Sequence, residues 1–366
     1  MRPHALAGLV GLALAAIAAP ARAAPQPGVV AGYDPEIGTF VRTADGRWEL
    51  NPYAMVQVTH IATGHGSDLD SNGFNLHAAK LIFHGHAFLP TLSYHLQLNA
   101  GEGRVAAEDV YLQWRATSWF SVLVGQYEVP FNRQHITLEA YQELVERSLV
   151  DARFNLQRDI GIIGYFSDPA RRYEATVGLF NGSRQNLAND ESGYLTTLRL
   201  AYNPMGPIAF READIDDTHR PKLSVAVAGA FNPERVVPGA TSNAPSTSLR
   251  QIAQGAFEVT LRFRGVSLST ELHARRQVES GSTAVSSAGG FEQIGYFIVP
   301  SRLQLVGRFA RVTGPVAKLE GVGEETVGLG YYFMGHRLKL QADGSHLETR
   351  TVRTGWRIRT QLEFFL

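Results

Sequence analysis

The sequence has 366 residues, with 34 basic side chains balanced by 34 acidic ones, and it contains no cysteine. The balanced charge gives no sign of a nucleic-acid partner, and the apolar fraction of 44% is too high for a disordered chain. The lack of cysteine excludes a disulfide framework, thiol chemistry and metal sites with cysteine ligands.

The first 23 residues have the pattern of a secretory signal peptide. Arg2 precedes an apolar run from Ala5 to Ala19, and Ala21-Arg22-Ala23 follows as a small-x-small cleavage pattern. The run is too short to span a membrane, and no later segment reaches the roughly 18 apolar residues that a spanning helix needs. We therefore expect export, cleavage near Ala23, and a Pro/Gly-rich periplasmic lead-in over residues 24–47.

From residue 48 to 366 the predicted elements are β-strands with one apolar and one polar face. The alternation is clear over residues 92–99, 109–115, 257–264, 302–309 and 356–366. A soluble sandwich would also alternate in this way, so the connections decide between the two folds. They alternate between long and short, as expected for an outer-membrane barrel with long external loops and short periplasmic turns.

The connections predict an all-β transmembrane antiparallel β-barrel of 16 strands, with both chain ends on the short-turn side. Long connections are expected at 62–73, 101–107, 129–157, 181–193, 232–250, 277–290, 313–323 and 346–354. The Pro- and Asp-rich stretch 203–220 lies where a short turn is expected but is too long for one. It leaves open a further strand pair, which would give 18 strands.

The third long connection, 129–157, carries a helical pattern. Pro130 ends the preceding strand, Thr137 is a candidate helix cap, and apolar side chains recur at helical spacing from Leu138 to Val145. We expect this loop to fold into the barrel and to rest a short helix on the wall.

Charged side chains of this loop are candidates for a pore constriction: Arg133, Glu139, Glu143, Glu146, Arg147, Arg153 and Arg158. Opposed carboxylates and guanidinium groups would create a transverse field that sorts solutes by charge. The alternative is that Glu146, Arg147, Arg158 and Asp159 form ion pairs that pin the loop to the wall. Pinning is favoured for these four, because buried charges need partners.

Basic side chains modestly exceed acidic ones on the predicted inward faces. The candidates for a basic lumen are Arg115, Arg199, Arg262, Arg264, Arg302, Arg308, Arg337, Lys339, Arg357 and Arg359. Such a lumen predicts a weak preference for anions. Pairing of these charges across neighbouring strands is the alternative.

Several short segments resemble the phosphate-selective porin O and P family. They are Gly125-Gln126 with Val129-Pro130-Phe131, Glu146-Arg147-Ser148, Arg158-Asp159-Ile160-Gly161 and Gly178-Leu179-Phe180-Asn181-Gly182. The resemblance is strongest over about 74–182. It implies a homotrimer of 16-stranded barrels in the outer membrane of a Gram-negative-type bacterium, each pore narrowed by the third long loop.

The sequence departs from the family's phosphate-selective members, which line their pores with lysine and arginine ladders. It has only four lysines, Lys80, Lys222, Lys318 and Lys339, and it ends in Leu366 where such barrels commonly end in phenylalanine. Arginine could take the place of lysine, because its planar fork binds phosphate in a bidentate manner.

The leading hypothesis is a porin for passive diffusion of small hydrophilic solutes and ions, embedded in outer-membrane lipid, with anion or phosphate preference left open. An adhesin or receptor acting through its long loops is the alternative from another class. No enzyme is predicted, since Gly-x-Ser-x-Gly is absent and no catalytic constellation stands out. His84, His86 and His95 have metal-ligand spacing, but no nearby carboxylate completes a site, so no metal or cofactor is predicted.

Overall fold

The computed structural model describes residues 28–34, 38–189, 193–235, 249–279, 283–315, 322–349 and 354–366. The predicted signal peptide, residues 1–23, lies outside the described residues. No helix in the described part of the chain is long and apolar enough to cross a membrane.

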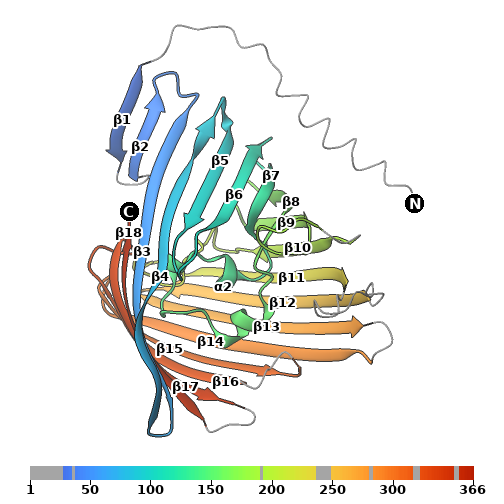
Figure 1. The fold of residues 1–366 in the computed structure, drawn as a ribbon. Coiled ribbons are helices and arrows are strands. Elements are labelled where there is room, and N and C mark those ends of the chain that lie inside the picture. The colour runs from blue at the N-terminus through green and yellow to red at the C-terminus, as the bar shows by residue number, and fades with distance from the viewer. Residues whose placement is uncertain are drawn as a thin grey trace.

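Sixteen consecutive strands form a closed antiparallel barrel. Each pairs with the strand before it, and the last pairs with the first through a register running from Gly355↔His65 to Phe365↔Met55. The strands are β3 (Glu49–His65), β4 (Asp68–Ala87), β5 (Leu89–Asn99), β6 (Ala106–Arg115), β7 (Phe120–Glu128), β8 (Arg158–Ser167), β9 (Tyr173–Phe180), β10 (Leu195–Tyr202), β11 (Lys222–Arg235), β12 (Leu249–Phe263), β13 (Val266–Glu279), β14 (Val285–Val299), β15 (Leu303–Thr313), β16 (Gly323–Tyr332), β17 (Leu338–Glu348) and β18 (Gly355–Phe365). The predicted strand count of the barrel is confirmed (Figure 1).

Two further strands form a hairpin outside the barrel closure. β1 (Val29–Asp34) pairs with β2 (Gly38–Thr43), and β2 joins β3 through Val41↔Leu50 and Arg42↔Glu49 alone. The additional pair left open at 203–220 is not formed there, since residues 203–221 contain no strand. The extra strands instead lie within the stretch 24–47, which the sequence analysis expected to be an irregular lead-in.

The prediction of a long connection at 62–73 is wrong. β3 and β4 remain paired to His65↔Asp68 and turn at Gly66, which has a φ of +58°. The segment is rich in Gly, Ser, Asp and Asn because it carries no buried face, so its composition is that of a loop although its backbone is a strand. β13 and β14 extend in the same way into the connection predicted at 277–290.

The faces of the strands are inverted relative to a soluble protein. Along β15, Leu305 and Phe309 are 43% and 48% exposed, whereas Gln304 and Arg308 are 0% and 4% exposed. Polar side chains therefore fill the interior, and apolar side chains cover the outside, as a lipid environment requires. This arrangement decides between the transmembrane barrel and the soluble sandwich.

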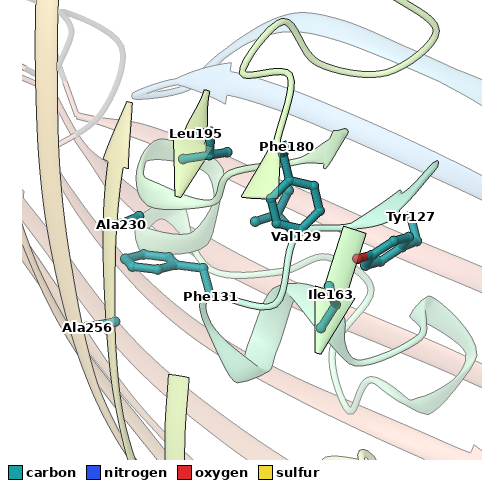
Figure 2. Close-up of a cluster of buried hydrophobic side chains, with 8 residues drawn as sticks. All are labelled: Tyr127, Val129, Phe131, Ile163, Phe180, Leu195, Ala230 and Ala256. Carbon is teal, nitrogen blue, oxygen red and sulfur yellow. The ribbon is translucent and has the colours of Figure 1, made fainter. Parts of the chain in front are cut away.

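The apolar packing inside the barrel is confined to places where a loop meets the wall. In one cluster Val129 and Phe131, both fully buried at the start of the loop after β7, pack beside Phe180, Ala230 and Ala256 (Figure 2). Each fully buried side chain of this size contributes about 1.5–3 kcal/mol. The cluster fixes the point at which the chain leaves the wall and enters the lumen.

Candidate pore constriction

The loop between β7 and β8, residues 129–157, lies inside the barrel. It contains two short helices, α2 (Arg133–Ile136) and α3 (Leu149–Phe154), and one turn of 3-10 helix, η1 (Glu139–Tyr141). Figure 1 shows α2 in the interior, between the β3–β7 wall and the β11–β17 wall.

Inward-facing carboxylates of the β12–β17 wall hold the loop by its backbone. Three loop N–H groups donate to them at 3.0, 3.0 and 2.9 Å: Arg133 to Glu258 of β12, Val145 to Asp343 of β17, and Leu149 to Glu324 of β16. α3 adds apolar contacts, with Val150 and Phe154 packed on Phe291, Ala310 and Val312. The loop is therefore held mainly by the β12–β17 wall, and on the β3–β4 side it makes a smaller apolar contact, of Ala140 with Met55 and Ala78.

The helix predicted to begin at Thr137 is wrong in position. The Thr137 hydroxyl donates to the Arg133 carbonyl at 2.9 Å, so this residue ends α2 instead of starting a helix. Between η1 and α3, the lumen side chains take the backbone groups that a helix would use, because Lys339 donates to the Gln142 carbonyl and Gln341 to the Glu143 carbonyl, both at 2.8 Å. These partners lie almost 200 residues away, so local spacing could not reveal them.

On the β4–β6 side of the barrel, Lys80 bridges the wall and the loop. Its ammonium group lies 2.5 Å from the Glu139 carboxylate on the loop and 2.8 Å from Glu108 on β6, and Lys80 itself is 2% exposed. Burial alone would favour the neutral acid, but Lys80, Arg147 and Arg158 together lower the pKa of Glu139. We call Lys80, Glu108 and Glu139 the neck.

Two further cations lie beside the neck, one joining strands of the wall and one joining parts of the loop. Arg158 at the start of β8 forms a bidentate pair with Asp109, at 3.0 and 3.1 Å, and lies 3.0 Å from Glu128. Arg147 donates from the loop to three loop carbonyls, those of Gln134, His135 and Thr137, at 2.8–3.1 Å.

The remaining candidates of the constriction make weaker or indirect contacts. The Glu146 carboxylate is half-buried, 3.7 Å from His77, while its carbonyl accepts from Arg308 at 2.9 Å. Arg153 is half-buried on α3, and its carbonyl accepts from Arg275 at 2.8 Å. Neither side chain reaches the neck contacts described above.

A cavity lies on each side of the neck. The one toward the long loops measures about 130 Å³ and includes His77, Lys80, Glu102, Arg104, Glu108 and Glu139 in its lining. The one toward the short turns measures about 630 Å³ and includes Tyr53, His84, His95, Leu138, Tyr141, Arg211, His336 and Arg337. Both run between the β4–β5 wall and residues 138–141 of the loop, and the Lys80–Glu139 contact separates them.

The connector between β10 and β11, residues 203–221, also enters the lumen. The Glu212 carboxylate accepts from the backbone N–H of Glu143 at 2.9 Å and from Gln134 at 3.2 Å, and Arg133 donates to the Ala209 carbonyl at 2.7 Å. The connector thus supports the loop from the short-turn side. The feature of the sequence that pointed to this connector is its unusual length, but the sequence analysis left that length open to a further strand pair.

This junction perturbs two of the predicted constriction residues. Burial and the neighbouring Glu212 raise the pKa of Glu143 to about 7. Burial, with Arg199 and Arg262 nearby, lowers the pKa of Arg133 to about 9. Glu143 and Arg133 therefore belong to the contact between loop and connector and lie away from the neck.

The predicted basic lumen divides into two groups. Five members are buried and engaged: Arg199 with Glu258 at 2.6 Å, Arg308 with Glu324 at 2.6 Å, Arg359 with Asp343 at 2.7 Å, Lys339 with Glu363 at 3.5 Å, and Arg262 with the Ala209 carbonyl at 2.8 Å. Arg357 is half-buried, 3.6 Å from Glu324. Arg115, Arg264 and Arg302 are exposed at or beside short turns, and Arg337 is half-buried in the turn before β17. The buried cations therefore form pairs, with no open ladder among the described residues.

The family model of the phosphate-selective porins O and P matches residues 58–217, which contain β4–β10, the loop and most of the connector. Over these residues the chain is similar to that family, and its barrel is that of an outer-membrane porin. The resemblance noted over 74–182 is confirmed and extended on both sides. The family and the fold are those of a channel, and they do not favour the adhesin or receptor alternative.

Solved porin structures share the fold at low sequence identity. An anion-selective porin from Comamonas acidovorans is 12% identical, with 87% of this chain and 99% of that chain covered and a TM-score of 0.60. OmpT of Vibrio cholerae is 9% identical, with 87% and 98% covered and a TM-score of 0.59. The outer membrane channel DcaP of Acinetobacter baumannii is 10% identical, with 89% and 99% covered and a TM-score of 0.58. No curated protein matches this porin in sequence.

Sequence reasoning missed two of the three neck residues, Lys80 and Glu108. Lys80 is one of only four lysines and interrupts the run Ala79-Lys80-Leu81-Ile82. A lone lysine on the inward face of a strand was a usable signal. Glu108 was hidden by a bulge that shifts the register of β5 and β6 between Leu96 and Leu98.

Proposed function

We propose that this porin passes small hydrophilic solutes and ions by passive diffusion along the β4–β6 wall. The observation that carries the proposal is the position of the neck between two cavities on the β4–β6 side of the barrel. Solutes would enter from the long-loop side, pass Lys80 and Glu139, and leave through the larger cavity. The proposal assigns the chain no catalytic step.

The charges around the neck favour weak discrimination. Three cations, Lys80, Arg147 and Arg158, face four carboxylates, those of Glu108, Asp109, Glu128 and Glu139, within their ion pairs. Neither sign dominates, and the buried arginines elsewhere bind carboxylates, as Arg199, Arg308 and Arg359 do, or backbone carbonyls, as Arg262 does. We therefore propose a general pore with low charge selectivity, without the strong phosphate preference that the family name suggests.

We also propose that the porin assembles as a homotrimer in outer-membrane lipid. OmpT of Vibrio cholerae, which shares the fold, is described in a trimer form. Mass photometry of the purified protein in detergent is expected to give three times the protomer mass. A single-protomer mass at all detergent concentrations would contradict the trimer.

The channel itself is tested by reconstitution in planar lipid bilayers. The wild-type protein is expected to give discrete conductance steps in KCl. Lys80→Ala with Glu139→Ala, which removes both sides of the neck contact, is expected to give larger steps. Exposed Arg302→Ala serves as the matched control and should conduct like wild type. Absence of any steps from folded wild-type protein would overturn the proposed function.

A further inference from the structure

The cavity on the short-turn side is larger than a simple exit requires. Its volume of about 630 Å³ falls within the roughly 300–1,000 Å³ of small-molecule binding pockets. Eight parts of the chain contribute to it: β2, β3, β4, β5, the loop, the connector, the turn before β17 and the end of β18. Its lining differs from the rest of the lumen, which is dominated by paired charges and amides.

One wall of this cavity carries a row of aromatic rings. Tyr53, His84 and His95 line the cavity, and Tyr111 continues the row beyond the lining. The four rings come from neighbouring strands, with centroids 5.0, 6.3 and 5.1 Å apart in that order. Their planes are nearly parallel, at 16°, 11° and 4°. The sheet register produces the row, because His84 lies opposite His95, and His95 opposite Tyr111.

The opposite side of the cavity also presents rings. Tyr141 of the loop packs edge-on against His336, at 5.0 Å, and against Phe365, at 6.1 Å. Phe365 in turn lies 6.0 Å from Tyr53, so the two groups of rings meet at one edge of the cavity. A solute in the cavity is therefore flanked by aromatic and imidazole surfaces on two sides.

The charged side chains that line this cavity are two arginines, Arg211 and Arg337, and one aspartate, Asp216. Arg211 and Asp216 lie 3.1 Å apart, with side chains 31% and 65% exposed. An exposed pair of this kind is weak and can exchange its carboxylate for that of a solute. Arg337 adds a second guanidinium, so the lining side chains favour an anion.

We propose that this cavity is a binding subsite for planar aromatic carboxylates, which rest between the ring row and Tyr141 with the carboxylate toward Arg211 and Arg337. Planar rings gain specific offset or edge-to-face contacts that a saturated ring of equal size lacks. The guanidinium groups supply charge-assisted hydrogen bonds to the carboxylate. The proposal rests on the porin function, because a solute must reach the cavity through the neck or from the short-turn side.

The test measures block of single-channel KCl current by three probes: benzoate, cyclohexanecarboxylate and benzyl alcohol. Cyclohexanecarboxylate matches benzoate in charge and approximate size but is not planar, and benzyl alcohol keeps the ring without the charge. In wild-type protein, benzoate is expected to block several-fold more strongly than either. Equal block by benzoate and cyclohexanecarboxylate would overturn the proposal while leaving the conductance, and so the porin function, intact.

Substitutions of the cavity side chains test whether the subsite lies in this cavity. His84→Gln with His95→Gln is expected to abolish the preference for benzoate over cyclohexanecarboxylate. Arg211→Gln is expected to weaken block by both acids and leave benzyl alcohol unchanged. His86→Gln is the matched control, because His86 lies two residues from His84, binds the Gly46 carbonyl and is outside the cavity lining.

Discrete conductance steps and the heat-dependent electrophoretic shift of each variant show that the barrel has folded. An undiminished preference in the double histidine variant, or equal loss in His86→Gln, would overturn the assignment. Should the double variant not conduct, His95→Gln alone is measured by the same criterion.

Discussion

At the scale of single residues, the neck depends on one lysine between two carboxylates. Lys80, Glu108 and Glu139 come from two strands and one loop, and each is largely buried. A buried charge that loses its partner is strongly destabilised, so changes here alter the local field as well as the width of the path.

Neutralising the carboxylate of the neck and neutralising its lysine are expected to shift ion selectivity in opposite directions. Glu139→Gln removes a negative charge and should move the reversal potential in a KCl gradient toward that of an anion-selective pore. Lys80→Gln removes a positive charge and should move it toward cation selectivity. Arg115→Gln, an exposed change near a short turn, is the control and should leave the potential unchanged. A shift of the same sign in both neck variants would contradict this account.

Glu143 is expected to make the attachment of the loop depend on pH. Its pKa is raised to about 7 in the folded protein, so its carboxyl costs nothing below its ordinary pKa near 4.5, where it is protonated in both folded and unfolded states. As the pH rises from about 4.5 to 7, the carboxyl ionises freely in the unfolded state while the folded state keeps it protonated beside Glu212, so the loop is progressively destabilised. Current fluctuations should therefore increase toward pH 8.

Glu143→Gln cannot ionise and should keep the quiet, low-pH behaviour across this range. Single-channel noise recorded from pH 5 to pH 8 provides the measurement. Equal pH dependence in the wild type and in Glu143→Gln would assign the effect to another group.

At the scale of elements, the lumen is organised by two segments that enter it from opposite ends. The loop 129–157 comes from the long-loop side and the connector 203–221 from the short-turn side, and they meet at Glu212. The pattern of strands and the position of the loop could be predicted, because alternation and loop length are local properties of the sequence. The meeting of loop and connector could not, because it depends on contacts between segments about 70 residues apart.

The same distinction explains the misplaced helix. Apolar spacing from Leu138 to Val145 indicated a helix, and Leu144 and Val145 are indeed buried. The backbone of Glu143 and Val145, however, is bound by Gln341 and Asp343 of β17, whose position follows only from barrel closure. Hydrogen bonds from side chains of the barrel wall therefore outweigh the local preference of these residues for a helix.

Removing the carboxylate of Glu212 is expected to loosen the loop. Glu212→Ala leaves the Glu143 N–H, the Gln134 amide and the Gln293 amide without this acceptor, and each buried unpaired group costs about 1–3 kcal/mol. Hydrogen exchange should become faster at loop residues 133–145 and stay unchanged in the strands. Asp216→Ala, an exposed change on the same connector, is the control, and unaltered exchange in Glu212→Ala would show that the wall alone holds the loop.

At the scale of the whole molecule, closure of the barrel does not involve the N-terminal hairpin. β18 pairs directly with β3 along eleven residue pairs, whereas β2 reaches β3 through two. The Tyr33 hydroxyl accepts a hydrogen bond from Arg337, which gives the hairpin one side-chain contact with the short-turn rim.

Deleting residues 29–43 is therefore expected to leave a folded, conducting barrel. The shortened protein should show the heat-dependent electrophoretic shift of an intact barrel and conductance steps similar to those of wild type. Deletion of β18, residues Gly355–Phe365, is the contrasting variant and should abolish both. Loss of the folded band on removing the hairpin would give it a role in assembly.

The loop is held mainly by the β12–β17 wall, and this arrangement affects how the permeability of this protein can change. The path has one rigid boundary, the hydrogen-bonded sheet of β4–β6, and one adjustable boundary, a segment held by side chains. Substitutions in residues 138–141 would widen or recharge the slot without breaking a single inter-strand hydrogen bond. Permeability and barrel stability therefore depend on different parts of the sequence. Substitutions in the loop can change which solutes cross the outer membrane while the barrel stays stable.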